Sequence, residues 1–184
     1  MFKDASRINH TYVLCFEFFS VCRTLIRSSS CSPNVTRFFN RQTFGIEIRA
    51  LRTIKKGEEI TTNYTDITTP TAERQDDLAP YGFQCACRAC RVSKKSDLLR
   101  FTLAKNDPQT LSGRRLVVWL MNPGLPESYV VDPCFERLKA IEAGGMEISD
   151  WYSKTVEYLF RVYCAMGNAS EAFKCEFTFP MSCT

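Results

Sequence analysis

The spacing of apolar residues predicts β-structure between residues 35 and 64. Apolar side chains alternate there with polar or small ones, at Phe44, Ile46 and Ile48. This two-residue period is typical of a strand with one buried face. A polar turn with a permissive glycine is expected at 55–58, and a second short strand at 60–64.

Elsewhere the pattern has the longer period of α-helices. A short helix is predicted over 71–78, ahead of Pro80. Another should begin at Asp132-Pro133, because Asp is a good N-cap and Pro fits the first helical position, and Gly144 can end it.

A further helix is predicted from a Ser149 cap to about Met166, with Gly167 as its stop. Residues at intervals of three or four give it one apolar face, namely Trp151, Thr155, Leu159, Val162 and Met166. Another helical segment opens at Asn168. Two antiparallel helices joined in this way resemble a tetratricopeptide-type pair, and a simple helical hairpin explains the pattern equally well.

Composition changes this picture little. The chain has 184 residues, of which 45% are apolar and 24% charged, as in ordinary globular proteins. Its net charge of +4 is small and spread along the chain, so direct nucleic-acid binding is not expected. Strands followed by helices predict an α+β fold.

The firmest chemical signal is a group of three neighbouring cysteines, Cys85, Cys87 and Cys90. Cysteines this close rarely pair as disulfides, but their thiolates can bind one zinc ion together with a fourth ligand. Such a zinc is structural, because no coordination position stays open for water. Nearby basic residues would offset its negative charge, namely Arg88, Arg91, Lys94 and Lys95. The alternative is three buried cysteines without a metal. We interpret the group as a metal site in an intracellular, reducing compartment.

One apolar stretch, 12–26, has some features of a membrane or targeting segment. It is shorter than the roughly 20 residues of a transmembrane helix, and it contains Glu17 and Arg23. Basic residues precede it, as in a signal peptide, but Glu17 interrupts it and no small-residue cleavage site follows. We therefore expect no membrane association.

Three motifs occur in the order found in SET-domain lysine methyltransferases. They are Cys-Ser-Pro-Asn at 31–34, a Gly-Glu-Glu segment that ends in tyrosine at 57–64, and Tyr-Gly-Phe-Gln-Cys-Ala-Cys at 81–87. Residues 1–91 thus resemble the C-terminal half of a SET domain and its post-SET segment, most similar to the SET-and-MYND branch. The resemblance implies a small β-rich SET half with a zinc-bound post-SET segment, followed by a helical region over 92–184.

The resemblance also implies roles for single residues. Tyr64 matches the catalytic tyrosine, although taken singly it would be an ordinary strand aromatic. Asn9 and His10 look like the pair that contacts the methyl donor S-adenosylmethionine, and Phe83 is placed like the aromatic that packs on its adenine. Tyr81 would line the channel for the substrate lysine.

The family's fourth zinc ligand belongs to a contiguous Asn-His-x-Cys-x-Pro-Asn motif, and its cysteine corresponds to Cys31. The implied ligands are therefore Cys31, Cys85, Cys87 and Cys90. Here, however, 11–30 separates the Asn-His pair from Cys31, and we interpret it as an insertion. Residues 12–30 can be the translation of a retained intron. The codons of Thr11 to Val13 can contain the splice-donor sequence GTATGT, and the Ser30 codon can contain the acceptor AG. Excision between these two sites would keep the reading frame.

The chain begins shortly before the Asn-His pair, so the N-terminal half of the SET domain, with its glycine-containing cofactor loop, is expected to be missing. The predicted function is methylation of lysines in a histone or non-histone protein, with S-adenosylmethionine as donor, in the nucleus or cytoplasm. We expect this chain to be weakly active or inactive. The alternative is a non-catalytic zinc-binding and helical module that binds a protein partner.

Overall fold

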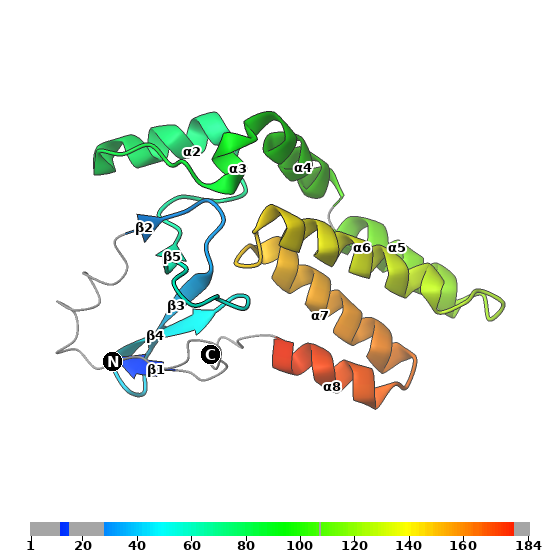
Figure 1. The fold of residues 1–184 in the computed structure, drawn as a ribbon. Helices are drawn as coiled ribbons and strands as arrows, with labels where there is room; N and C mark the ends of the chain where they lie inside the picture. The colour runs from blue at the N-terminus through cyan, green and yellow to red at the C-terminus, as the bar shows by residue number, and fades with distance from the viewer. Residues whose placement is uncertain (1–11, 15–27, 107, 179–184) are drawn as a thin grey trace. The chain divides into compact units, whose positions relative to one another are not determined.

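The computed structural model describes residues 12–14, 28–106 and 108–178. The chain divides into two compact units, Met1–Asp97 and Leu98–Thr184. The first contains strands and short helices and the second contains helices, so the predicted α+β class is confirmed (Figure 1).

Two small sheets form the β-rich part of the first unit. In the larger sheet β4 (Gly45–Ala50) is central and pairs antiparallel with both β1 (Tyr12–Leu14) and β3 (Val35–Asn40). In the smaller one β2 (Ser28–Ser29) pairs parallel with β5 (Thr61–Thr62). The pairing of β2 with β5 brings the chain just before Cys31 alongside the chain just before Tyr64.

Turn residues shorten the predicted strands. Phe44, expected within a strand, lies in the β3–β4 turn with a φ of 52° and is exposed. Gly57 has a φ of 83° in the predicted polar turn, where the Glu58 N–H donates to the Lys55 carbonyl at 3.0 Å. The second strand is only β5, two residues long.

The buried face of β4 is the opposite of the predicted one. Glu47 is 5% exposed, whereas Ile46 and Ile48 are half-buried. Asn40 Nδ2 donates to one Glu47 oxygen at 2.6 Å and Arg49 Nη2 donates to the other at 2.9 Å. These two bonds hold the pKa of Glu47 below its usual value. The carboxylate can therefore be buried because its charge is satisfied.

Three helices and one 3₁₀ turn follow the strands. The predicted helix over 71–78 is confirmed as α2 (Thr71–Leu78). The 3₁₀ turn η3 (Ala79–Tyr81) comes next, and then α3 (Arg88–Arg91) and α4 (Ser93–Lys105).

The second unit consists mainly of α5 (Pro108–Leu120), α6 (Ser128–Gly144), α7 (Asp150–Ala165) and α8 (Ala169–Thr178). Helix α7 contacts each of the other three (Figure 1). The two helices predicted on either side of Gly167 are confirmed as α7 and α8, and Gly167 between them has a φ of 70°. Within the described parts of the chain, no helix is both long enough and apolar enough to cross a membrane.

Helix α6 begins at Ser128, earlier than predicted, so Pro133 lies inside it. Proline has no N–H, and it therefore leaves the carbonyl of Tyr129 without its helical partner. Arg115 Nη1 of α5 donates to that carbonyl at 3.3 Å, and its guanidinium carbon lies 5.3 Å from the Tyr129 ring centroid. A side chain from another helix thus compensates for the proline.

Candidate metal centre and adjoining cavity

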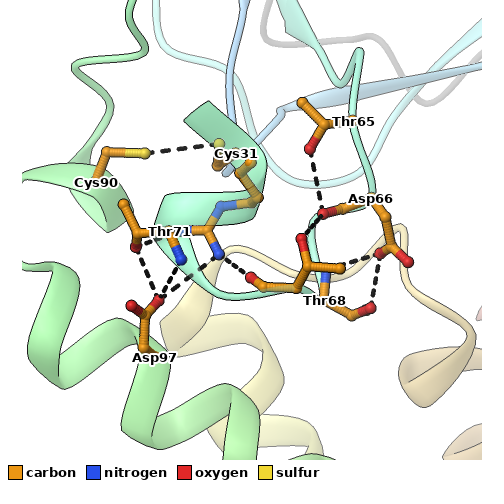
Figure 2. A network of polar contacts seen from close by, with 9 residues as sticks. Cys31, Thr65, Asp66, Thr68, Thr71, Cys90 and Asp97 are labelled. Carbon is orange, nitrogen blue, oxygen red and sulfur yellow. Dashed lines mark hydrogen bonds and ion pairs between the residues drawn. The ribbon is translucent and has the colours of Figure 1, made fainter. Parts of the chain in front are cut away.

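The thiols of four cysteines meet in the first unit. Cys31 follows β2, Cys85 and Cys87 lie in the loop after η3, and Cys90 lies in α3. The four sulfur atoms lie within 4.8 Å of one another, and Figure 2 shows the pair Cys31–Cys90, whose sulfurs are 3.6 Å apart. Zinc bound tetrahedrally at about 2.3 Å holds its sulfurs roughly 3.8 Å apart. The cluster therefore fits zinc in both donor chemistry and size.

Two side chains of helix α2, Gln75 and Leu78, contact the cysteines of this cluster. Gln75 clamps the backbone of Cys85, because its Oε1 accepts from the Cys85 N–H at 3.0 Å and its Nε2 donates to the Cys85 carbonyl at 2.9 Å. Leu78, one turn further, is 0% exposed and packs with Cys31 and Ala89. These contacts fix the first cysteine of the trio before any metal binds.

Helix α3 sets the spacing of the other two thiols. Cys87 stands at its N-cap with extended backbone angles, and the Arg91 N–H donates to the Cys87 carbonyl at 3.0 Å. Residues three apart lie on one side of a helical turn. The turn therefore brings Cys90 back to the side of Cys87.

The close thiols do not ionise equally. Hydrogen bonds from Cys31 and Cys85 lower the pKa of Cys87. Hydrogen bonds to Cys85 and Cys87, together with burial, raise the pKa of Cys31. Burial and the neighbouring thiolates raise the pKa of Cys90 to about 11. Zinc needs all its ligands deprotonated, so its binding would displace protons from this cluster.

Arg74 is a buried cation that none of the sequence motifs indicated. It is 0% exposed, and although burial alone would lower its pKa, the neighbouring thiols of Cys31 and Cys90 raise it. The basic residues expected to offset the cluster's charge are all exposed, namely Arg88, Arg91, Lys94 and Lys95. The helical spacing between Arg74 and Leu78 places them on one face of α2, and this was the signal that could have identified Arg74.

Asn34 ties the first two motifs together. It is 1% exposed, its Oδ1 accepts from the Thr61 N–H at 2.8 Å, and its Nδ2 donates to the Glu59 carbonyl at 2.8 Å. Glu58 accepts from Asn34 Nδ2 at 3.2 Å and also bonds Arg52. The Gly-Glu-Glu segment is therefore held against the residues that follow Cys31.

The aromatic residues of the predicted site lie close to the cluster. Tyr64 and Phe83 are half-buried and pack against the core formed around Cys31. The ring centroids of Tyr64 and Tyr81 are 5.2 Å apart, and the Arg37 guanidinium carbon lies 5.9 Å from the Tyr64 centroid. Tyr81 is 59% exposed. The Tyr64 ring is therefore held between a second ring and a cation.

A cavity of about 580 Å³ adjoins the cysteines, and Phe83, Asn34 and Ser29 are among the residues that line it. This volume is typical of small-molecule sites. Tyr64 and Tyr81 do not line the cavity.

The predicted cofactor contacts Asn9 and His10 lie outside the described residues. The two motif positions that come before Cys31, where the family has Asn-His, are occupied by Ser28 and Ser29. Ser29 lies in β2 and lines the cavity. The cavity wall therefore has a serine at a position where the family motif has histidine.

Comparisons with known proteins agree with these motifs. The SET domain family model matches residues 6–65. Histone-lysine N-methyltransferase set5 of Schizosaccharomyces pombe is 40% identical over 83 residues, which are 42% of this chain and 26% of that protein. N-lysine methyltransferase SMYD2-B of Danio rerio is 36% identical over 81 residues, 44% of this chain and 18% of that protein. Histone-lysine N-methyltransferase Smyd1 of Mus musculus is 37% identical over 91 residues, 43% and 18% respectively.

The chain thus spans between 18% and 26% of these three relatives. The matched region contains Cys31 and Tyr64, which lie in one core with the later cysteines, and Asn34, whose Oδ1 accepts from the Thr61 N–H. Residues 6–65 therefore match the SET domain family, and the relatives of this chain include lysine methyltransferases of the SET and SET-and-MYND type.

Proposed function

We propose that this chain carries the C-terminal SET part and the zinc-bound post-SET segment of a protein-lysine methyltransferase that uses S-adenosylmethionine. The supporting observation is the meeting of Cys31 with the later cysteine trio, beside Tyr64 and Phe83. The substrate would be a lysine of a histone or another protein, in the nucleus or cytoplasm.

The zinc would have a structural role. Four thiolates leave no open position for water, so the ion would not take part in the chemistry. It would instead join the segment after β2 to the post-SET loop, because Cys31 comes from one and Cys85 from the other. Phe83 precedes Cys85 by two residues, so the same link would hold Phe83 at the cavity wall.

S-adenosylmethionine, when bound, supplies an electrophilic methyl group on a sulfonium sulfur. The Tyr64 hydroxyl would orient the substrate amine, and Tyr81, 5.2 Å away between ring centroids, would form a second wall of the lysine channel. Lysine must lose its proton before it can attack, against a reference pKa near 10.4. Burial between two aromatic rings favours the neutral amine by removing water.

The full chain is expected to bind the cofactor weakly. Ser28 and Ser29 occupy the two motif positions before Cys31, so they stand in for the family's Asn-His pair. Removal of 12–30 would join Asn9-His10-Thr11 directly to Cys31 and restore the motif. The two forms therefore differ in cofactor contacts while they share all four cysteines.

The test compares the full chain with the 12–30 deletion, both loaded with zinc. Isothermal titration with S-adenosylmethionine should give at least tenfold tighter binding to the deletion form, equivalent to about 1.4 kcal/mol. Transfer of labelled methyl to a mixture of histones should be low for the full chain. Strong transfer by the full chain, abolished in Tyr64→Phe, would contradict the proposed weak activity.

The second candidate is a non-catalytic module that binds zinc and a protein partner. It is favoured by the serines before Cys31 and by exposed aromatic residues of the second unit, such as Phe135 at 42% and Phe173 at 59%. Stoichiometric zinc without measurable S-adenosylmethionine binding in either form would support this module and contradict the methyltransferase.

A further inference from the structure

We propose that Arg74 is a positioning residue of the metal centre, with its Nε donating a hydrogen bond to the Cys31 thiolate and its charge balancing the bound thiolates. The inference rests on the zinc centre proposed above. It assigns to a buried arginine of α2 the charge compensation that the neighbouring surface cations were expected to give.

The two outer nitrogens of Arg74 already have partners. Nη2 donates to Thr71 Oγ1 at 2.8 Å, and Nη1 donates to the Thr69 carbonyl and lies 3.7 Å from an Asp97 oxygen. Nε, by contrast, is buried and has no hydrogen-bond partner among the described residues. A guanidinium has a fixed planar geometry, so anchoring one side of it fixes the direction of Nε.

The unpartnered donor belongs to a group that faces the cluster. Although burial alone would lower it, the pKa of Arg74 is raised by the neighbouring thiols of Cys31 and Cys90, and Cys31 is itself 1% exposed. A buried donor without a partner destabilises the fold, because it has given up its hydrogen bonds to water. A thiolate at Cys31 would remove that cost and gain a charge-assisted bond.

Charge balance favours the same arrangement. Zinc with four thiolates has a net charge of −2, and a buried cation compensates for it more strongly than one in water. Arg74 is 0% exposed, whereas Lys94 and Lys95 are exposed. Removal of Arg74 should therefore weaken zinc binding far more than removal of a surface lysine.

Asp97 of α4 completes the arrangement on the side away from the thiols. Its Oδ1 accepts from the Thr71 N–H at 2.9 Å and from the Thr71 hydroxyl at 2.8 Å, as Figure 2 shows. It therefore caps the start of α2 and stands beside Arg74 at once. Opposite charges alternate along the line from thiolate to guanidinium to carboxylate, so the guanidinium is held in place from both ends.

The test measures zinc affinity by competition with a chelator for the full chain, Arg74→Met, Arg74→Lys and Lys94→Met. Loss of an outer partner of a metal ligand typically costs 10–100-fold in metal affinity. We expect a loss of this size for Arg74→Met, a smaller loss for Arg74→Lys, which keeps the charge, and wild-type affinity for Lys94→Met.

Cobalt substitution supplies a second readout. A hydrogen bond to a thiolate lowers the energy of its sulfur lone pair, so its loss should shift the sulfur-to-cobalt charge-transfer band to longer wavelength. Both Arg74 variants should show this shift and Lys94→Met should not. If Arg74→Met fails to fold, the Arg74→Lys spectrum and affinity decide the matter.

Wild-type affinity together with an unshifted cobalt band in the Arg74 variants would overturn the inference. A change in Lys94→Met equal to that in Arg74→Met would also overturn it, because surface charge would then suffice. If the unsubstituted chain binds no zinc at all, the proposed zinc centre is contradicted. This result is distinguishable from the two outcomes above, in which the unsubstituted chain still binds zinc.

Discussion

Asn34 connects two motifs through one buried side chain. Its amide satisfies the Thr61 N–H and the Glu59 carbonyl, both at 2.8 Å, and these backbone groups have to be paired because they lie next to a buried residue. The conformation of the Gly-Glu-Glu segment thus depends on a residue more than twenty positions upstream.

Asn34→Ala should lower the free energy of unfolding by about 2–4 kcal/mol, because it leaves two backbone groups without partners. Urea denaturation of the zinc-loaded chain measures this. Asn63→Ala is the matched control, since Asn63 is half-buried and its Nδ2 donates to the Thr65 carbonyl at 3.1 Å. We expect about 1 kcal/mol or less for that variant, and equal losses in the two variants would contradict the role given to Asn34.

Glu58 should make the free energy of unfolding depend on pH, with stability lost as the pH falls. Its bond with Arg52, assisted by the Lys55 N–H, lowers the pKa of Glu58 from 4.5 to about 2. The unfolded chain therefore takes up a proton first as the pH falls. The stabilisation is complete above pH 4.5 and is lost progressively between about 4.5 and 2.

The difference in unfolding free energy between wild type and Glu58→Gln measures this contribution. It should be roughly 1 kcal/mol and constant from pH 8 to 5, and it should narrow below pH 4.5. The neighbouring Glu59→Gln variant removes an equal charge from an exposed side chain and should have little effect. A difference that grows as the pH falls would contradict the expected sign.

At the scale of elements, α7 is the centre of the second unit's core. Leu159 is 2% exposed and Val162 0% exposed, both in contact with the residues of the neighbouring helices. Leu159→Ala should destabilise the protein by about 2–5 kcal/mol through lost burial and the cavity left behind.

The adjacent Phe160, 38% exposed, is the control for that substitution. Phe160→Ala should cost clearly less than Leu159→Ala, about 1–2 kcal/mol, because more than a third of the Phe160 surface is already exposed to water. Thermal unfolding followed by helical circular dichroism separates the two variants. Comparable melting temperatures for both would show that α7 does not bury the face assigned to it.

Elements with a strong period could be predicted from the sequence, and elements governed by polar contacts could not. The apolar spacing along α7 predicted its buried face correctly. The predicted helix over 71–78 has the same two ends as α2. The two-residue period of β4 predicted the wrong buried face, because it does not contain the contacts by which Asn40 and Arg49 satisfy a buried Glu47.

The start of α6 predicted from Pro133 was also wrong. Pro133 indicated a helix start because proline lacks the N–H that a helix interior needs. In the structure α6 continues through it, since Arg115 supplies a donor to the carbonyl left free. A contact between helices distant in sequence decided the boundary, and no local pattern contains it.

The residues of the candidate site also fall into two groups, those that a sequence motif indicates and those that only tertiary packing places there. Short motifs indicated Cys31, the cysteine trio and Tyr64, because each stands at a fixed spacing within a motif. Gln75 and Arg74 stand in no motif, and their roles follow only from where α2 packs. The supporting residues of a site depend on tertiary contacts and therefore escape prediction from sequence.

At the scale of the whole molecule, the two units should respond differently to removal of zinc. The first unit has a small buried core centred on the cysteines, and the second has a core of its own around Val130 and Val162. A strong chelator should therefore abolish amide-exchange protection around residues 28–97 and leave it largely intact in α6 and α7. Equal loss in both units, or no loss in either, would contradict this expectation.

We propose that Cys31 completes one metal centre with Cys85, Cys87 and Cys90, and the functional interpretation depends on this centre. Zinc K-edge X-ray absorption of the purified full chain, with the zinc content measured in parallel, tests it most directly. We expect one zinc per chain with four sulfur neighbours at about 2.3 Å, and three in Cys31→Ser. Nitrogen or oxygen ligands in the unsubstituted chain, or a sulfur count that Cys31→Ser leaves unchanged, would contradict it.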